Sequence, residues 1–162
     1  MSVYRLKTKI MIINHRLDKS FGPVGSSAGI FVFIAGIIST YFSFTGIVLV
    51  LLGAFVGFSS SSTAIDFDKR RIRFSNDIFG FVKTGKWINI EPEMKLGIRH
   101  EDRVWRAYSR SNRILDIATD DLRIFIFTSE NKIIMPVMKT DSPEIAEAEL
   151  EKLGAELGLS LI

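Results

Sequence analysis

Residues 29–58 read GIFVFIAGIISTYFSFTGIVLVLLGAFVGF, a run with no charged residue and no histidine. The uncharged stretch is longer still, because Asp, Glu, Lys, Arg and His are absent from Ser20 to Ile65. A membrane-spanning helix needs about 20 apolar residues at about 1.5 Å of rise each. The stretch therefore predicts two membrane-crossing helices joined as a hairpin.

The predicted helices run from Val24 to Phe42 and from Gly46 to Ser62, with Ser43–Thr45 at the turn. Backbone groups within hydrocarbon must be hydrogen-bonded inside the protein, so the turn is expected at the far interface. A secretory signal peptide is one alternative, but its apolar region would be only about 7 to 15 residues long. A very hydrophobic soluble core is the other.

Small residues recur four positions apart within this hairpin, a pattern that lets helix backbones approach closely in lipid. The candidate helix-packing residues are Gly25, Gly29, Gly36, Gly53, Gly57 and Ser61. They would pack the two helices on each other or against another subunit. The hairpin has no charged residue or histidine of the kind that marks an ion or proton path.

The net charge of +3 is unevenly distributed, with +4 in residues 1–20 and −1 in residues 66–162. Positive residues beside membrane helices stay on the cytoplasmic side, so both termini are expected there. Basic residues on the two flanks are candidate contacts for anionic lipid head groups. These are Arg16, Lys19, Lys69, Arg70, Arg71 and Arg73.

Three regions follow from these patterns: a basic cytoplasmic arm at 1–20, the hairpin at 21–62 and a soluble domain at 63–162. Apolar and basic residues alternate in the arm, which favours a strand over an interfacial helix. The arm would lie on anionic head groups, or bind a partner or the soluble domain.

The soluble domain alternates with period two over many short segments, which predicts an antiparallel meander. The expected strands are 63–68, the return strand through Ile72 and Phe74, 85–90, 94–99, 104–109, 114–119, 122–128 and 132–138. Turns are expected at Asp120-Asp121 and Ser111-Asn112-Arg113, and a polar turn at His100-Glu101-Asp102. A helix should follow from Ser142-Pro143 to about Leu157, before Gly158.

This order of elements resembles the bacterial pleckstrin-homology-like (PH-like) membrane proteins. The segments that carry the resemblance are Ile65-Asp66-Phe67 with Lys69-Arg70-Arg71, Gly85-Lys86-Trp87-Ile88, and the last strand pair running into the helix. The resemblance implies an α+β fold, in which an antiparallel barrel or sandwich of about seven strands is covered by a C-terminal helix. It also implies a location in the bacterial inner membrane.

No catalytic, cofactor or metal site is predicted. Cysteine is absent, and the two histidines, His15 and His100, lie in different regions without metal-ligand spacing. Arginines interleave with aromatic residues in one strand, which favours a protein interface over nucleic acid because the domain is nearly neutral. The residues of this candidate interface are Arg103, Trp105, Arg106, Tyr108 and Arg110.

The expected function is therefore that of a non-enzymatic membrane protein whose soluble domain binds a protein partner, as an accessory or scaffold subunit of a membrane complex. A homo-oligomer is compatible with the same features. The alternative is a membrane-anchored module that senses anionic lipid through the basic residues 69–73.

Overall fold

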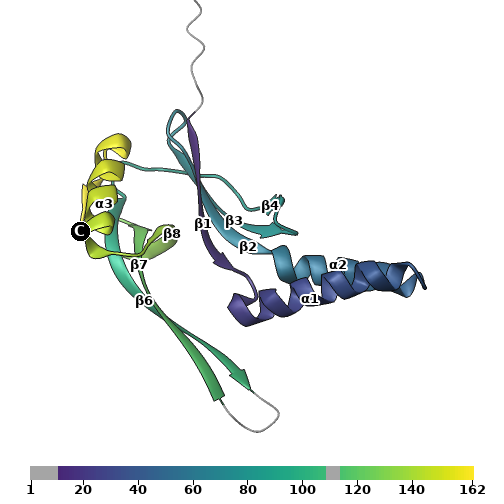
Figure 1. Cartoon of the computed structure of the whole chain (residues 1–162). Helices are drawn as coiled ribbons and strands as arrows, with labels where there is room; N and C mark the ends of the chain where they lie inside the picture. Colours follow the sequence, from purple (N-terminus) through teal and green to yellow (C-terminus); the bar gives the residue numbers. More distant parts are fainter. Residues whose placement is uncertain (1–10, 109–113) are drawn as a thin grey trace, which may run out of the picture.

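The structure, a computed structural model, describes residues 11–108 and 114–162. Within these residues the chain has three helices and two sheets, which confirms the α+β class (Figure 1). The helices are α1 (Gly22–Thr40), α2 (Thr45–Phe58) and α3 (Pro143–Leu157). Helix α2 ends before the predicted Ser62, because Ser60 already pairs with the neighbouring strand.

The first sheet contains five strands in the order β1-β2-β3-β4, with β5 also paired to β3, and all its pairs are antiparallel. Its strands are β1 (Ile12–Lys19), β2 (Ser60–Asp66), β3 (Arg71–Ile78), β4 (Val82–Thr84) and β5 (Ile88–Asn89). Strand β1 confirms the strand predicted for the arm over these residues. Residues 1–10 lie outside the described part of the chain.

The second sheet has the order β8-β7-β6-β9, and only the short β9 runs parallel to its neighbour. Its strands are β6 (Lys95–Tyr108), β7 (Ile114–Phe127), β8 (Ile133–Thr140) and β9 (Ser160–Leu161). The described residues thus form nine strands instead of about seven. Their pairings give two separate sheets and no closed barrel.

Two predicted turns are wrong. Strand β6 runs without interruption through His100-Glu101-Asp102, and β7 runs through Asp120-Asp121. In the register of this pair Glu101 lies opposite Asp121, so both acidic segments continue the ladder. The turn predicted at Ser111-Asn112-Arg113 lies outside the described residues.

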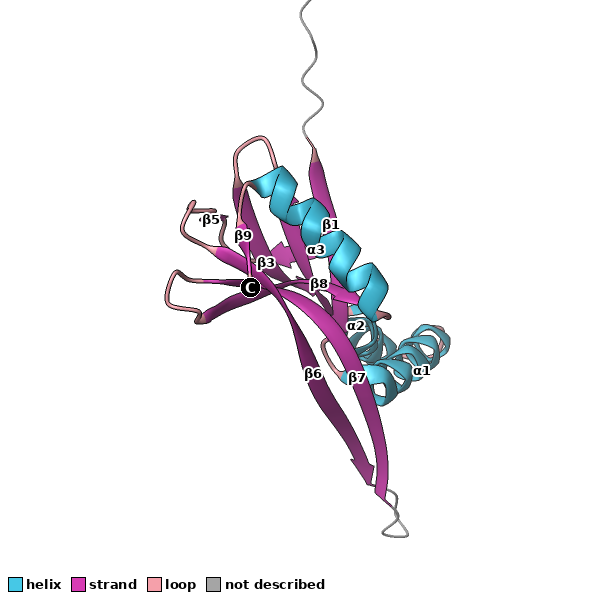
Figure 2. Cartoon of the chain, turned by 90° about the vertical axis from the view of Figure 1, so that its left-hand side faces the viewer, coloured by secondary structure: helices cyan, strands magenta, loops and turns pink. Residues whose placement is uncertain are grey.

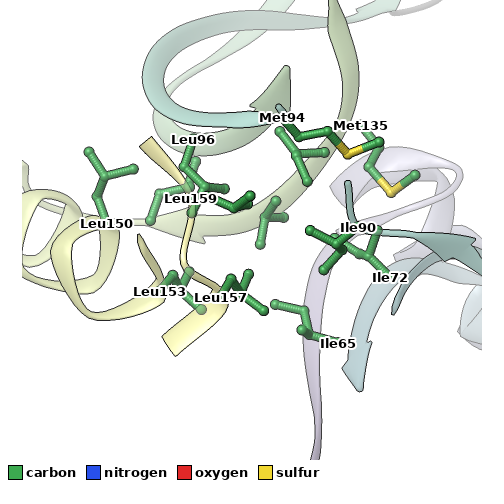
Figure 3. Close-up of a cluster of buried hydrophobic side chains, with 13 residues drawn as sticks. Ile65, Ile72, Ile90, Met94, Leu96, Met135, Leu150, Leu153, Leu157 and Leu159 are labelled. Atoms are coloured by element: carbon green, nitrogen blue, oxygen red, sulfur yellow. The ribbon is translucent and has the colours of Figure 1, made fainter. Parts of the chain in front are cut away.

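The hydrophobic core lies between the two sheets and under α3 (Figures 2 and 3). Leu150, Leu153 and Leu157 of α3 pack into it. Sheet residues complete it, among them Ile65, Ile72, Leu96, Ile124 and Ile126. Each such buried side chain contributes about 1.5–3 kcal/mol, so this cluster holds the two sheets together.

Helix α3 begins and ends at the residues that the sequence indicated. The Ser142 hydroxyl accepts a hydrogen bond from the Ile145 amide, and Pro143 occupies the first turn. Gly158 ends the helix with φ of +63°, a left-handed conformation that glycine adopts without a steric penalty.

A buried cluster of charges joins β1 to the second sheet. Arg123 of β7 is 1% exposed, and its guanidinium lies 2.8 Å from Asp18 of β1, 2.9 Å from Glu101 of β6 and 3.3 Å from Asp121. Lys139 of β8 lies 2.8 Å from the same Asp121 carboxylate. The acidic residues that the sequence placed in turns are therefore partners of a buried arginine.

Replacing Arg123 with Met should lower the free energy of unfolding by about 3–5 kcal/mol, because it leaves buried carboxylates without their shared cation. Lys132→Met is the matched control, since it breaks an ion pair with Glu130 that is about three-quarters exposed. That loss should be below about 1 kcal/mol. Thermal unfolding in mild detergent measures both, and equal losses in the two variants would contradict a structural role for the cluster.

Candidate functional site

Helix α1 is long and apolar enough to cross a membrane, judged by its length and composition. Only 22% of its most apolar window is buried within the protein, whereas a core helix of a soluble protein would be mostly buried. Helix α2 is also apolar but has 14 residues, which span about 21 Å. The two helices extend together from the sheets in Figure 1.

Glycines line the contact between α1 and α2. A Cβ atom added to Gly29 would meet the backbone of Gly57, one added to Gly36 would meet Val50, and one added to Gly53 would meet Phe33. From Gly29 to Gly36 the residue number rises along α1, while the number of the α2 partner falls from Gly57 to Val50. The two helices are therefore antiparallel.

The other two predicted packing residues lie elsewhere. Gly25 faces Phe21 of its own chain segment, and Ser61 belongs to β2. Gly46, which was not among the predicted packing residues, faces Thr40 at the turn end of the helix pair.

The predicted lipid contacts divide into two groups. Arg16 and Lys19 lie on β1, directly before α1, and line a cavity of about 210 Å³ at the base of the helices. Lys69–Arg73 begin at the opposite end of β2, seven residues of strand away from α2. Strand β3 then runs back along β2 and brings Arg73 opposite Ala64, two residues along β2 from Ser62, which pairs with Arg16.

The side chains of the second group make contacts within the protein. Arg70 donates a hydrogen bond of 2.6 Å to the carbonyl of Leu157, which ends α3. The guanidinium groups of Arg71 and Arg73 lie 4.5 and 4.6 Å from the centre of the Trp87 ring. These arginines help to hold β3, β5 and α3 in place.

Asp66 organises the turn between β2 and β3. Its carboxylate accepts hydrogen bonds from the Lys69 amide at 3.1 Å and from Arg71 Nε at 2.9 Å. Burial alone would raise the pKa of Asp66, but these hydrogen bonds and the two positive charges outweigh it and hold the pKa below 3.8. The folded turn therefore stabilises the ionised form of the Asp66 carboxyl group.

The predicted protein interface falls on the long β6–β7 ribbon, which leaves the body of the protein in Figures 1 and 2. Arg103, Trp105, Arg106 and Tyr108 are in β6, whereas Arg110 lies outside the described residues. The pairing of β7 with β8 ends at Leu122, and β9 pairs only with Lys95 and Leu96. In the described pairings, the outer half of the ribbon is therefore joined by no third strand.

The register of this outer ribbon pairs apolar residues with one another. Trp105 pairs with Ile117, and Ala107 pairs with Leu115. Val104 pairs with Ala118, and Tyr108 pairs with Ile114.

Among the described residues, no group of three or more His, Asp or Glu side chains is placed to hold a metal ion. His15 lies on β1 facing Glu149 and Lys152 of α3, and its partial burial lowers its pKa below 6.5. His100 lies within β6. The structure thus keeps the two histidines on different sheets.

Several residues of the candidate site carried no recognisable signal in the sequence. Ser60 sits in a run of four serines, and Gly80-Phe81 begins a segment that reads only as a hairpin turn. Both line the cavity beside Arg16 and Lys19.

Replacing Gly53 with Val should separate α1 from α2, because the added Cβ would meet the backbone of Phe33. We expect the variant to have a lower thermal midpoint in detergent. Fluorescence-detected size exclusion after heating measures that midpoint. Ala35→Val is the control, because it adds two carbon atoms on the exposed surface of α1, outside the contact. Similar midpoints for the two variants would contradict close packing at Gly53.

Replacing Asp66 with Asn should lower stability at neutral pH and flatten its acid dependence. A carboxylate whose pKa is lowered by folding stabilises the protein above its ordinary pKa and loses that effect as pH falls through the folded value. The variant and the wild type should therefore differ most above pH 3.8 and converge below it. Thermal midpoints measured across this range test the expectation, with Asp68→Asn in the same turn as control.

Comparisons with known proteins complete this description. No protein-family model matches the chain, and no curated protein or solved structure matches it either. The resemblance to PH-like membrane proteins stays a prediction from the sequence.

Proposed function

We propose that this chain is a non-enzymatic integral membrane protein that carries an interaction domain. Helices α1 and α2 would insert into the bilayer as a pair. Large apolar side chains that are more than one-third exposed cover their outer surfaces, including Phe31, Ile34, Ile38, Val48 and Leu52. Lipid tails would cover this apolar surface, which is far larger than a soluble protein exposes.

The aromatic turn between the helices supports this placement. Tyr41, Phe42 and Phe44 are each more than four-fifths exposed. Tyrosine in particular favours the membrane–water interface. Because α2 spans about 21 Å, the turn would reach the far interface of a locally thinned bilayer.

Pairing of β1 with β2 supports a topology in which the segments before α1 and after α2 lie on the same side of the bilayer. It brings the start of α1 beside the end of α2, so the two sheets would lie on a single side of the bilayer. Arg16 and Lys19 at that side favour the cytoplasm, by the rule that positive residues stay inside. In a bacterium this would be the inner membrane.

The outer β6–β7 ribbon carries the proposal of protein binding. A two-stranded ribbon is only marginally stable in water, and its unpaired edges invite another strand. The register of the ribbon also pairs apolar residues with one another, such as Trp105 with Ile117. We therefore assign it an extended segment of a partner protein, bound by strand addition, which suits an accessory or scaffold subunit of a membrane complex.

The PH-like fold is part of the same proposal. The two sheets with α3 over their shared core support it, although the strands are not closed into a barrel. Sensing of anionic lipid remains the second candidate function. The observation that favours it is the cavity lined by Arg16 and Lys19.

Placing a photo-cross-linking amino acid at Trp105 should capture the partner in intact membranes. We expect a covalent adduct of defined mass, identified by mass spectrometry, because Trp105 lies in the part of the ribbon without a third strand. The same amino acid at Ile145, which is half-exposed on α3, is the control.

The result divides the candidate functions. An adduct with another membrane protein at Trp105 and not at Ile145 supports the accessory-subunit proposal. An adduct only with a second copy of this chain would make the ribbon a homo-oligomer contact. Equal labelling at both positions would refute the proposal that the ribbon binds a partner protein.

A further inference from the structure

The cavity at the base of the helices is formed by three segments that are distant in the sequence. Arg16 and Lys19 come from β1, and Phe58 and Ser60 from the junction of α2 with β2. The turn between β3 and β4 supplies Phe79, Gly80 and Phe81. The lining thus combines two cations, a hydroxyl group and three aromatic rings.

The β3–β4 turn is fixed against the end of α2. The Phe79 amide donates a hydrogen bond of 3.2 Å to the Ser59 hydroxyl, and the Phe79 ring packs edge-on against Phe55 of α2 at 5.8 Å. Gly80 has φ of +80°, and a Cβ atom there would lie 3.2 Å from the Phe58 carbonyl. The wall of the cavity is therefore built by specific contacts.

Buried polar groups beside the cavity lack partners. Ser60 is 2% exposed and lines the cavity, yet its hydroxyl has no hydrogen-bond partner among the described residues. The same holds for the hydroxyls of Ser62 and Ser75, which lie opposite each other on β2 and β3. Buried hydroxyls without partners are rare and point to a bound polar group or ordered water.

The strand register places these hydroxyls among cations. Arg16 lies opposite Ser62, and Lys19 lies opposite Ser60. Asp77 is the next residue in the row of Ser60, and Lys83 of β4 lies opposite Asp77. Lys19 and Lys83 therefore lie in the row of Asp77, and Arg16 lies in the next row of the same face. One oxygen of the Asp77 carboxylate is buried without a hydrogen-bond partner among the described residues. Three cations against one carboxylate leave an excess of positive charge, which favours an anionic ligand.

We propose that this cavity binds the phosphate of an anionic phospholipid head group. The Arg16 and Lys19 side chains would pair with the phosphate oxygens, and the Ser60 hydroxyl would donate a hydrogen bond to them. Charge-assisted hydrogen bonds of this kind are the strong ones, and they would supply the missing partner of Ser60.

The aromatic rim distinguishes a lipid from a free phosphate ion. Phe81 is three-quarters exposed and Phe58 about two-fifths exposed beside the cations. Exposed phenylalanines at the base of an apolar helix pair would contact the acyl chains below the head group. This inference rests on the proposed insertion of α1 and α2 into the bilayer.

Lipid retention by the full-length protein tests the assignment. The protein is first shown to need detergent for extraction from alkali-washed membranes, and release without detergent would refute the membrane insertion itself. Native mass spectrometry then measures binding of phosphatidylglycerol, phosphatidylcholine with the same acyl chains, and inorganic phosphate. We expect one phosphatidylglycerol to be retained in preference to the other two.

Charge variants identify the site. Arg16→Gln with Lys19→Gln should weaken phosphatidylglycerol binding about 25-fold, at about fivefold for each cation lost. Lys132→Gln with Lys152→Gln removes the same charge at exposed positions away from the cavity and should change binding less than about twofold. Equal weakening in the two double variants overturns the proposal, since it would mean general attraction to anionic lipid.

Ser60→Ala separates a ligand contact from a structural role. It should weaken phosphatidylglycerol binding about five- to tenfold without lowering the thermal midpoint of the lipid-free protein, because an unsatisfied buried hydroxyl does not stabilise the fold. Unchanged binding means that the hydroxyl is satisfied by water only, which overturns its assignment. Tighter binding of inorganic phosphate than of phosphatidylglycerol overturns the lipid as the source of the phosphate.

Discussion

Antiparallel pairing of β1 with β2 is the contact on which the rest of the structure depends. The two strands flank the apolar helices in the sequence, and the Ser20 amide closes the base with a hydrogen bond of 3.1 Å to the Ser59 carbonyl. The segment between these strands consists of α1, α2 and their turn. Closing a long loop costs little more entropy than closing a short one, so the length of this segment does not prevent the strands from pairing. The pairing fixes the helices to one edge of the sheet and brings Arg16 beside Ser62.

Features that depend on local chemistry could be predicted from the sequence. The uncharged stretch indicates its own two helices, and the run of Ser142, Pro143 and the later Gly158 delimits α3. In each case the deciding residues lie within or directly beside the element that they define, so one continuous segment of sequence is enough for the prediction.

Features that depend on distant partners could not be predicted. Acidic residues such as Glu101 and Asp121 usually mark turns, but here both lie within long strands because Arg123 binds them. Likewise, Ser60 becomes part of a cavity only because β3 returns beside β2 and its turn folds back onto α2. Nothing near these residues in the sequence announces the partner that determines their role.

The buried arginine also relates the two candidate binding surfaces to each other. Asp18 of β1 lies between the cavity residues Arg16 and Lys19 in the sequence, and its carboxylate binds Arg123 at 2.8 Å. Arg123 belongs to β7, the strand that continues into the outer ribbon. A shift of β1 would therefore have to break a buried ion pair or carry the inner part of β7 with it. Because broken buried pairs are costly, β1 and β7 are held together around Arg123.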